Sequence, residues 1–482
     1  MQRARRATMA LVRQGWQNGS GGPRLPPGPR PLPFLGNILQ VDTKNFPKSV
    51  EELSRTFGPV FTIHLGSQRA VVLYGQEVVR EALLDRGEDF GTRGMTPILD
   101  KLAGGTGIGF SNGETWRQLR QFATATLRDL EKWTEERIQE EARFLVERLW
   151  SMKGRPLDPS LLLSQVTTNI LCAVAFGSRF HYEDQEFLRF LHLLEENARL
   201  QSSTMTKLYN VFPSVLDYLP GSHQTIFRNT SELRHFISRR VKKEAPQPEA
   251  PQGFIDAFLL KMEQEKQNSQ SVFSLQSLER STLDFFVAGA ESTSLVLMYA
   301  LLALMKYPEV QERVCQEIDR VLGPSQSPCL ADLSQMPYMD AVIHEVHRSL
   351  ALVPLNVPHA VTKDTIFRQY LIPKGTTVFP ALKASLYDRT EFPCPERFDP
   401  GHFLDRKGAL RRSECFIPFS TGPRACLGER LASTVIFICL ATLLQHFKLR
   451  PHVPPEELDL SPTVGFLTAA PKPYRLSLEP RW

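Results

Sequence analysis

Cysteine is scarce in this chain: its 482 residues include only seven, and no two of them form a Cys-x-x-Cys pair. An odd number at wide spacings argues against the disulfide framework of a secreted protein, and the missing pairs argue against a structural zinc site. The sequence therefore favours a reducing compartment in which most cysteines are small buried apolar side chains. The seven are Cys172, Cys315, Cys329, Cys394, Cys415, Cys426 and Cys439.

Long apolar runs and strong charge are also missing. No stretch approaches the roughly 18 apolar residues of a membrane-spanning helix. The net charge of +5 is too small, and the basic residues too dispersed, to indicate nucleic-acid binding. No acidic residue precedes Asp42, and the Arg-rich start resembles either a mitochondrial transit peptide or a solvated basic tail. We expect residues 1–22 to be a disordered basic segment without an anchor helix.

Proline and glycine set the next boundary along the chain. The run LPPGPRPLPFLGN cannot form a helix interior, so residues 23–37 are predicted to be an extended connector. A short helix, the strand-like runs VFTIHL and AVVLY and a second helical pattern come next. Helical periodicity then dominates to about residue 307. Its longest uninterrupted part, 274–306, is apolar on most faces and is predicted to cross the centre of one large domain, 38–482.

One cysteine has unusual neighbours. The stretch FIPFSTGPRACLGERLA, residues 416–432, places Cys426 in a loop of Gly, Pro and Arg before an apolar run. That run is a predicted helix, whose N-terminus would stabilise a thiolate at Cys426, and Arg424 adds positive charge. A metal ligand or a nucleophile fits this position. An inert buried thiol beside a tight turn fits the loop equally well.

Five residues of this loop match F-x-x-G-x-R-x-C-x-G, so it resembles the heme-thiolate loop of the cytochromes P450. Such a match arises by chance in roughly one chain in several thousand at average composition. The matching residues are Phe419, Gly422, Arg424, Cys426 and Gly428. The resemblance implies that Cys426 is the axial ligand of the heme iron. It also implies that Phe419 packs near the porphyrin and that Arg424 pairs with a propionate.

Other segments resemble the same family in the expected order. ETWRQLR holds Trp116 and Arg120 on one helix face, where both side chains can donate hydrogen bonds to a propionate. VPHAVTKD supplies His359, where the family has another propionate donor. Taken alone, these residues would be interpreted as a half-buried tryptophan, a surface arginine and a structural histidine. The interpretation as propionate donors rests on their position among the other segments that resemble the family.

The family's E-x-x-R motif is matched by HEVHR, with Glu345 and Arg348 one helical turn apart. CPERFDPGHF resembles the segment whose arginine, here Arg397, completes a buried Glu–Arg–Arg cluster that braces the heme loop. The resemblance implies a structural role for these three residues.

AGAESTS, residues 288–294, falls within the long helix and resembles the family's oxygen-binding motif A-G-x-[DE]-T-[TS]. Glu291 takes the acid position and Ser292 the threonine position, and an acid–alcohol pair can relay protons to dioxygen. Gly289 is expected to permit a local opening of the helix. Because serine lacks the methyl group that restricts χ1, the relay is expected to be less well positioned than with threonine. Ordinary small and polar helix residues are the plain alternative.

The resemblance covers about residues 25–475 and is closest to family 2 of the vertebrate microsomal enzymes. It implies the P450 fold, a mainly α domain with small β-sheets (α+β), and heme b as the cofactor. The implied reaction is monooxygenation of a lipophilic xenobiotic, fatty acid or eicosanoid, or steroid. Electrons from NADPH would come through a flavin reductase, with cytochrome b5 as a further partner.

The family's location, the cytoplasmic face of the endoplasmic reticulum membrane, is implied as well. Because the family's anchor helix is missing here, a mitochondrial or soluble location stays open, and the apolar loop at 212–219 is the expected membrane contact. Basic residues expected to face the reductase, each equally explained as solvated surface charge, are Arg117, Arg128, Lys132, Arg411 and Arg412.

Alignment with the family's pocket segments predicts an apolar, aromatic wall around the substrate, although each of its residues could instead be plain core. These residues are Phe110, Phe285, Phe286, Ala288, Val353, Leu355, Val357 and Phe466. Two other classes stay open: a heme-thiolate protein that binds or senses a ligand without turnover, and a peroxide-using isomerase or dehydratase. Retention of Glu291 beside a hydroxyl favours oxygen activation over both. A non-heme cysteine enzyme is the remote alternative.

Overall fold

The computed structural model describes residues 24–42, 45–243, 251–465 and 467–481. The predicted basic segment 1–22 and the predicted pocket residue Phe466 lie outside the described residues. The first part of the proline-rich connector runs along the first strand, where the Thr62 N–H donates to the Pro27 carbonyl over 2.7 Å. Its second part is not extended, because residues 33–35 form a turn closed by the Leu32 N–H and the Gly36 carbonyl over 2.8 Å. Proline lacks an N–H, but its carbonyl can still accept, so this run can line a strand.

The main sheet has five strands in the order β1-β2-β7-β4-β3. β1 (Val60–Leu65) and β2 (Gln68–Tyr74) are the two predicted strand-like runs and pair antiparallel. β7 (Thr377–Ala381) pairs parallel to β2, so a segment from far along the chain completes the sheet. The short strands β4 (His359–Ala360) and β3 (Thr92–Arg93) pair with each other at its other edge. This pairing fixes the position of Arg93 in the two-residue β3.

Helices make up most of the chain as far as residue 350. They are α2 (Phe46–Phe57), α3 (Gln76–Arg80), α4 (Pro97–Ala103), α5 (Gly107–Phe110), α6 (Gly113–Asp129), α7 (Glu131–Ser151), α8 (Ser160–Phe176), α9 (Gln185–Gln201), α10 (Thr204–Tyr209), α11 (Pro213–Leu216), α12 (Ser222–Lys243), α13 (Phe254–Gln264), α14 (Leu275–Lys306), α15 (Pro308–Val321) and α16 (Pro337–Leu350). The predicted helical region is confirmed, and the segment 212–219, expected to be an apolar loop, contains the short helix α11.

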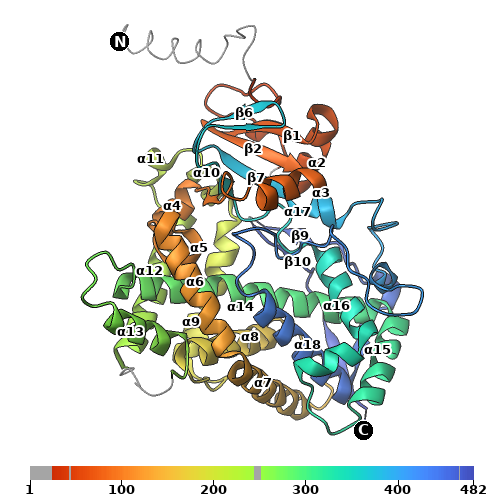
Figure 1. Cartoon of the computed structure of the whole chain (residues 1–482). Coiled ribbons are helices and arrows are strands. Elements are labelled where there is room, and N and C mark those ends of the chain that lie inside the picture. The colour runs from red at the N-terminus through yellow and green to blue at the C-terminus, as the bar shows by residue number, and fades with distance from the viewer. Residues whose placement is uncertain (1–23, 43–44, 244–250, 466, 482) are drawn as a thin grey trace, which may run out of the picture.

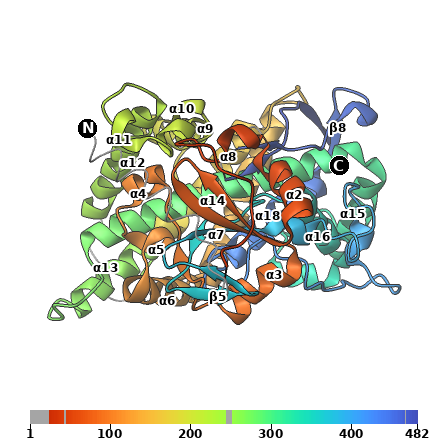
Figure 2. The ribbon, with the colours of Figure 1, turned by 90° about the horizontal axis from the view of Figure 1, so that it is seen from above.

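α14 is the predicted long helix, and it begins with a capping box in which Ser274 and Ser277 exchange hydrogen bonds. It packs against α8, α5, α12, α16 and α18 (Glu429–His446). Figures 1 and 2 together show the main sheet lying over the middle of α14. Within the described residues, α14 is the one helix long and apolar enough to cross a membrane, but two-thirds of its most apolar window is buried inside the protein. It is the central core helix that the sequence predicted.

Small elements after α16 complete the fold. They are β5 (Thr365–Phe367), β6 (Tyr370–Ile372), α17 (Leu382–Leu386), β8 (Phe447–Pro451), β9 (Thr463–Val464), β10 (Ala469–Ala470) and β11 (Leu476–Pro480). One large apolar core runs from α5 to β11, and satellite clusters lie under the sheet and the loops. The predicted mainly α fold with small β-sheets is confirmed.

Candidate functional site

The loop that carries Cys426 lies directly before α18, as predicted. The Cys426 N–H donates to the Phe419 carbonyl over 2.9 Å, which folds the loop back on itself. α18 starts three residues later at Glu429. The Cys426 side chain is accessible, yet surrounding protein desolvates it, so it faces a space inside the molecule rather than the outer surface.

Gly422 fixes the shape of this loop. Its φ is +77°, which L side chains rarely adopt, and an added Cβ would lie 1.8 Å from the Leu83 carbonyl oxygen. The loop therefore rests directly on the backbone that follows α3. Only glycine permits that approach.

Gly422→Ala is expected to lower the free energy of unfolding by about 2–4 kcal/mol, because overpacking and a disfavoured φ act together. Gly428→Ala is the matched control, since its added Cβ meets nothing within 4 Å and its φ is −92°. The control should cost at most about 1 kcal/mol. Denaturant unfolding of both variants measures the difference, and equal losses would contradict the close approach at Gly422.

Burial raises the pKa of the Cys426 thiol, against the sequence-based expectation of a thiolate favoured by the loop alone. The Gly428 N–H and the charges of Arg120 and Arg93 oppose that rise without overcoming it. Desolvation outweighs the helix terminus because the thiol lies deep inside the protein. A positively charged ligand atom at the sulfur would be needed to make the thiolate the stable form.

Three guanidinium groups converge near Cys426, from β3, α6 and the cysteine loop. Burial, together with the charge of Arg120, lowers the pKa of Arg93 to about 10. Burial and both other arginines lower the pKa of Arg424 to about 8. Within the described part of the chain, none of the three forms an ion pair with a carboxylate. Three guanidinium groups held this close together indicate a binding site for an anionic ligand.

Arg424 is the most constrained of the three. Its side chain is only 5% exposed, and it donates to the carbonyls of Gly91 (2.8 Å) and Ser111 (2.9 Å) and to Asn112 Oδ1 (2.8 Å). Its Nη1 is buried and has no hydrogen-bond partner among the residues that the structure describes. An unpaired buried guanidinium nitrogen is costly, so this atom indicates a missing acceptor.

The predicted pair Trp116 and Arg120 lies beside Arg424. The Arg424 guanidinium sits 3.8 Å over the centroid of the Trp116 ring, a cation–π contact that fixes the plane of the guanidinium. Arg120 Nη2 donates to the Ala425 carbonyl over 2.8 Å, one residue before the cysteine. The two side chains are therefore brought to the same loop, as the motif predicts.

His359 is buried and tied to protein atoms on both ring nitrogens. Its Nδ1 lies 2.8 Å from the Phe90 carbonyl, and its Nε2 lies 3.2 Å from Arg93 Nη1. Burial and the charge of Arg93 lower its pKa to about 3, so the ring is neutral. With Nδ1–H donating to Phe90, Nε2 accepts from Arg93. His359 therefore orients the guanidinium of Arg93.

Arg93 was missed by the sequence reasoning. It lies in the unremarkable stretch GTRGM, and no spacing or motif separates it from the other arginines. Only the pairing of β3 with β4 brings it to His359 and, through the Arg93 Nε–Gly109 carbonyl contact (3.3 Å), to α5.

Glu345 and Arg348 form the predicted buried pair, with contacts of 2.7 and 2.8 Å and no exposed surface on either side chain. The prediction for Arg397 is wrong: its side chain is exposed, and it gives Arg348 only its backbone carbonyl, over 3.2 Å. His402 takes the third place, with Nδ1 3.2 Å from Glu345 Oε2. Burial opposes protonation of His402, but the bond to Glu345 outweighs it and raises the pKa.

α14 exposes side chains at its midpoint although it crosses the centre of the protein. Val287, Ala288 and Glu291 are exposed there, so this stretch faces a space inside the molecule. Burial and the charge of Glu195 raise the pKa of Glu291. Ser292 Oγ donates to the Ala288 carbonyl over 2.6 Å, so the helix itself holds the hydroxyl.

The expected opening of α14 at Gly289 does not occur, because the helix is continuous there. An added Cβ would lie 3.1 Å from Leu171 Cδ1, so the missing side chain lets α8 pack closely against α14. Gly289 serves helix packing in this structure.

The predicted pocket residues separate into two groups. The prediction that Phe286 lines the pocket is wrong. Its side chain has no exposed surface and packs between Phe176 and Phe190, whose ring centroids lie 5.5 and 4.9 Å away. A side chain without accessible surface cannot line a pocket. The others are half-buried or exposed, as a lining requires, namely Phe110, Phe285, Ala288, Val353, Leu355 and Val357.

Comparison with known proteins agrees with this geometry. The sequence model described as "Cytochrome P450" matches residues 26–478. The chain belongs to the cytochrome P450 family. It is 50% identical to Cytochrome P450 2H1 of Gallus gallus over 476 residues, which are 98% of this chain and 96% of that protein. It is 47% identical to Cytochrome P450 2C29 of Mus musculus and to Cytochrome P450 2C5 of Oryctolagus cuniculus, each over 96% of both chains.

P450 proteins are heme-thiolate monooxygenases, and the residues present here fit a heme. A single loop cysteine is accessible inside the protein, and uncompensated guanidinium groups surround it. The carboxylates of a heme would supply an acceptor for Arg424 Nη1. The predicted cofactor class and the predicted enzyme class are confirmed by the family.

Proposed function

We propose that this chain inserts one oxygen atom from O2 into a lipophilic small molecule, using two electrons from NADPH delivered by a flavin reductase. The balance is RH + O2 + NADPH + H⁺ giving ROH + H2O + NADP⁺. The observation that supports this proposal most is the set of guanidinium groups beside Cys426, which have no carboxylate partner among the described residues. A structural thiol would not need such a cluster.

Cys426 would hold the heme iron through its sulfur, and Arg93, Arg120 and Arg424 would hold the propionates. Trp116 would keep Arg424 in place by its ring contact. The bound heme supplies oxygen activation, which a thiolate ligand promotes. Arg93 replaces His359 as the direct propionate donor, since the histidine's two nitrogens are engaged by Phe90 and Arg93.

Glu291 and Ser292 would handle protons at the exposed stretch of α14. Because the pKa of Glu291 is raised, its carboxyl stays protonated up to a higher pH than the carboxyl of a fully solvated glutamate does. Ser292 can accept a proton from a donor and pass on its own, once its hydroxyl leaves the Ala288 carbonyl. The hydroxyl's rotational freedom limits this relay.

Ser292→Thr is expected to raise the ratio of hydroxylated product to peroxide about two- to tenfold, because the added methyl group restricts χ1 of the hydroxyl. NADPH consumed, peroxide and product are measured together in a reconstituted reaction with reductase. Ser294→Thr makes the same change further along α14, at a buried hydroxyl that donates to the Glu291 carbonyl, and is the control. An unchanged ratio for Ser292→Thr would refute the relay.

The substrate would be lipophilic, because the remaining lining is apolar and aromatic. Phe110 comes from α5, Phe285 and Ala288 from α14, and Val353, Leu355 and Val357 from the segment between α16 and β4. Fatty acids or eicosanoids, steroids and xenobiotics all match this chemistry. The names of the relatives state no substrate.

The reductase, and cytochrome b5 as a second donor, would meet the side of α6 and of the cysteine loop. Lys132 and Arg412 are exposed and available to acidic partners. Arg117 and Arg128 are exposed too, but they pair with Glu114 (2.6 Å) and Asp129 (3.9 Å). Arg411 is a weaker candidate, because it donates to the His402 carbonyl (3.0 Å) and pairs with Glu391 (2.8 Å).

The membrane contact would be larger than the loop at 212–219. Val215 and Tyr218 are 62% and 89% exposed, and the connector adds Phe34 and Leu39 at 76% and 71%. The β1–β2 turn lies between these two groups. Gly36 of the connector pairs with Leu65 at one side of the turn, and Val211, shortly before α11, packs against Gly66. A continuous apolar face of this kind suits the cytoplasmic surface of the endoplasmic reticulum membrane.

NADPH consumption with and without reductase tests the proposal. Hydroxylated product that depends on both reductase and O2 is expected with a panel of lauric acid, progesterone and 7-ethoxycoumarin. Isomerisation or dehydration of an organic peroxide while no substrate of the panel is hydroxylated with NADPH, reductase and O2, or ligand-induced spectral change with no turnover of any substrate, would contradict the proposed electron supply.

A further inference from the structure

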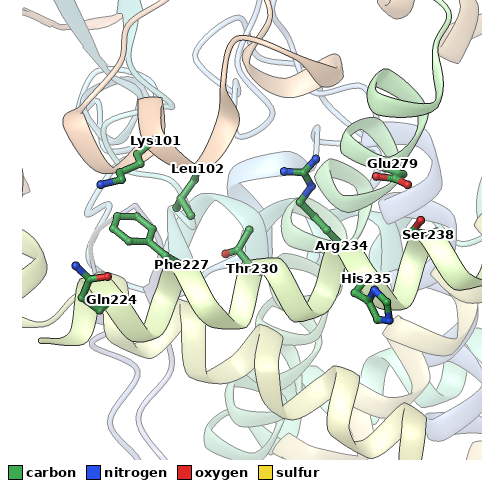
Figure 3. A pocket seen from close by; sticks show the side chains of 10 residues that line it. Lys101, Leu102, Gln224, Phe227, Thr230, Arg234, His235, Ser238 and Glu279 are labelled. Atoms are coloured by element: carbon green, nitrogen blue, oxygen red, sulfur yellow. The ribbon is translucent and has the colours of Figure 1, made fainter. Parts of the chain in front are cut away.

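A groove of about 650 Å³ separates α4, α12 and the first turns of α14 (Figure 3). α12 contributes side chains that recur every three or four residues and so share one face of the helix. They are Gln224, Phe227, Thr230, Ser231, Arg234, His235 and Ser238. Lys101 and Leu102 of α4 and Glu279 of α14 face this stripe. None of these residues belongs to the site around Cys426.

One end of the groove is apolar and electrically neutral. Figure 3 shows Phe227 beside Leu102, with Lys101 extending above the ring. Lys101 Nζ lies 4.9 Å from the centroid of that ring and is also paired with Asp217. The carboxylate compensates the lysine charge, so this end offers hydrocarbon contact rather than a second cationic site.

The other end holds a guanidinium with unused donors. Arg234 extends from α12 into the groove (Figure 3), and its Nε is buried with no hydrogen-bond partner in the described part of the chain. Among the described residues, Arg234 forms no ion pair with a carboxylate, although Glu279 stands on another wall. Thr230 has its hydroxyl one helical turn before Arg234; this oxygen already accepts from Asn197 Nδ2 over 3.2 Å, so the hydroxyl can still donate. A planar acceptor with two oxygens is the natural partner for such a guanidinium.

The walls of the groove are fixed before any ligand binds. Arg280 Nη1 donates to the Leu102 carbonyl over 2.9 Å, and the same side chain pairs with Asp284 over 2.7 Å. Asp284 in turn accepts from the Gly109 N–H over 2.9 Å. This chain of contacts holds α4 and α5 on α14, so binding in the groove would not have to order them first.

We propose that this groove binds a lipophilic monocarboxylate, with the carboxylate on Arg234 and the hydrocarbon chain against Phe227 and Leu102. Glu279 selects for a single negative charge, because a dianionic phosphate would be repelled more strongly than a carboxylate. Thr230 donates a further hydrogen bond to the second carboxylate oxygen. The groove is a second ligand site, separate from the lining residues around the exposed stretch of α14.

Equilibrium dialysis of radiolabelled decanoate against the holoenzyme tests the site, with the heme iron first saturated by clotrimazole so that the substrate space is filled. One decanoate should bind per protein molecule. Arg234→Gln should weaken its affinity about tenfold or more, the usual effect of losing a charged hydrogen bond. Glu279→Gln should strengthen it. Arg228→Gln is the matched control, because this exposed arginine on α12 lies outside the groove and, within the described residues, bonds only to Thr225.

Decanol and decyl phosphate, as neutral and dianionic analogues, should both bind more weakly than decanoate. A gain of affinity in Glu279→Gln cannot arise from misfolding, and an unchanged clotrimazole spectrum shows that each variant is intact. The proposal would be overturned by no decanoate binding to the clotrimazole complex, by equal effects of Arg234→Gln and Arg228→Gln, or by decanol binding as tightly as decanoate. None of these results would affect the proposed monooxygenation.

Discussion

Cys426→Ser is expected to reduce NADPH- and O2-dependent product formation at least a thousandfold and to abolish thiolate ligation of the heme. A serine hydroxyl is not deprotonated at neutral pH and does not supply the electron density that a thiolate gives to the iron. The loop itself should survive, because serine is similar in size and the Cys426 N–H bond to the Phe419 carbonyl involves only backbone atoms. Product formation in the reconstituted system and the absorption spectrum of the purified protein measure the effect.

Cys415→Ser is the matched control. Cys415 lies in the same segment, is half-buried and packs beside an aromatic cluster away from the three arginines. It should keep most of the parent activity. If the two serine variants lost activity equally, or if Cys426→Ser remained active, the assignment of Cys426 as the iron ligand would be wrong.

Arg348→Met is expected to lower the free energy of unfolding by about 3–5 kcal/mol, because it leaves the carboxylate of Glu345 buried without its main partner. Arg348 also donates to the carbonyls of Leu386 and Pro395, over 3.1 and 2.9 Å, so those acceptors lose a partner as well. The side chain holds α16 to the segment that leads into the cysteine loop. The free energy of denaturant unfolding and the heme content of the purified protein should both fall.

Arg389→Met removes an arginine from an exposed ion pair with Glu396 in the same region and serves as the control. Solvent screens that pair, so the change should cost less than about 1 kcal/mol. A similar loss in the two variants would show that the Glu345–Arg348 pair does not brace the loop.

Local sequence signals located much of the site. Motifs with fixed spacing identified Cys426, Gly422, Arg424, Trp116 and Arg120, because each depends on a loop or a single helix face. The long helix could be predicted for the same reason: its periodicity and its Ser274 cap are local. Elements of this kind keep their structure wherever the rest of the chain places them.

Tertiary contacts explain what the sequence did not predict. Arg93 reaches the site only through the β3–β4 pairing, and β7 joins β2 from a remote segment. His402 rather than Arg397 meets Glu345, because the backbone after residue 397 turns through a 3₁₀ helix at Pro400–Phe403 that presents the histidine inward. Phe286 packs into the core, since neighbouring α8 and α9 contribute Phe176 and Phe190 at that level. The spacing of residues along the sequence does not encode these tertiary contacts.

The pKa of Cys426 shows the same limit in electrostatic terms. A helix N-terminus and a nearby arginine are visible in sequence and favour a thiolate. The amount of protein around the sulfur is not visible, and it raises the pKa of the thiol. The iron of a bound heme would resolve the conflict, because it would stabilise a thiolate at Cys426 that the loop alone does not.

The difference spectrum of the reduced protein with carbon monoxide tests the central claim most directly. Thiolate ligation by Cys426 predicts the strongly red-shifted Soret band of a heme-thiolate complex in the parent protein and in Cys415→Ser, and its loss in Cys426→Ser. A Soret band at the position of an imidazole-ligated heme in the parent protein, or a red-shifted band that persists in Cys426→Ser, would contradict the account.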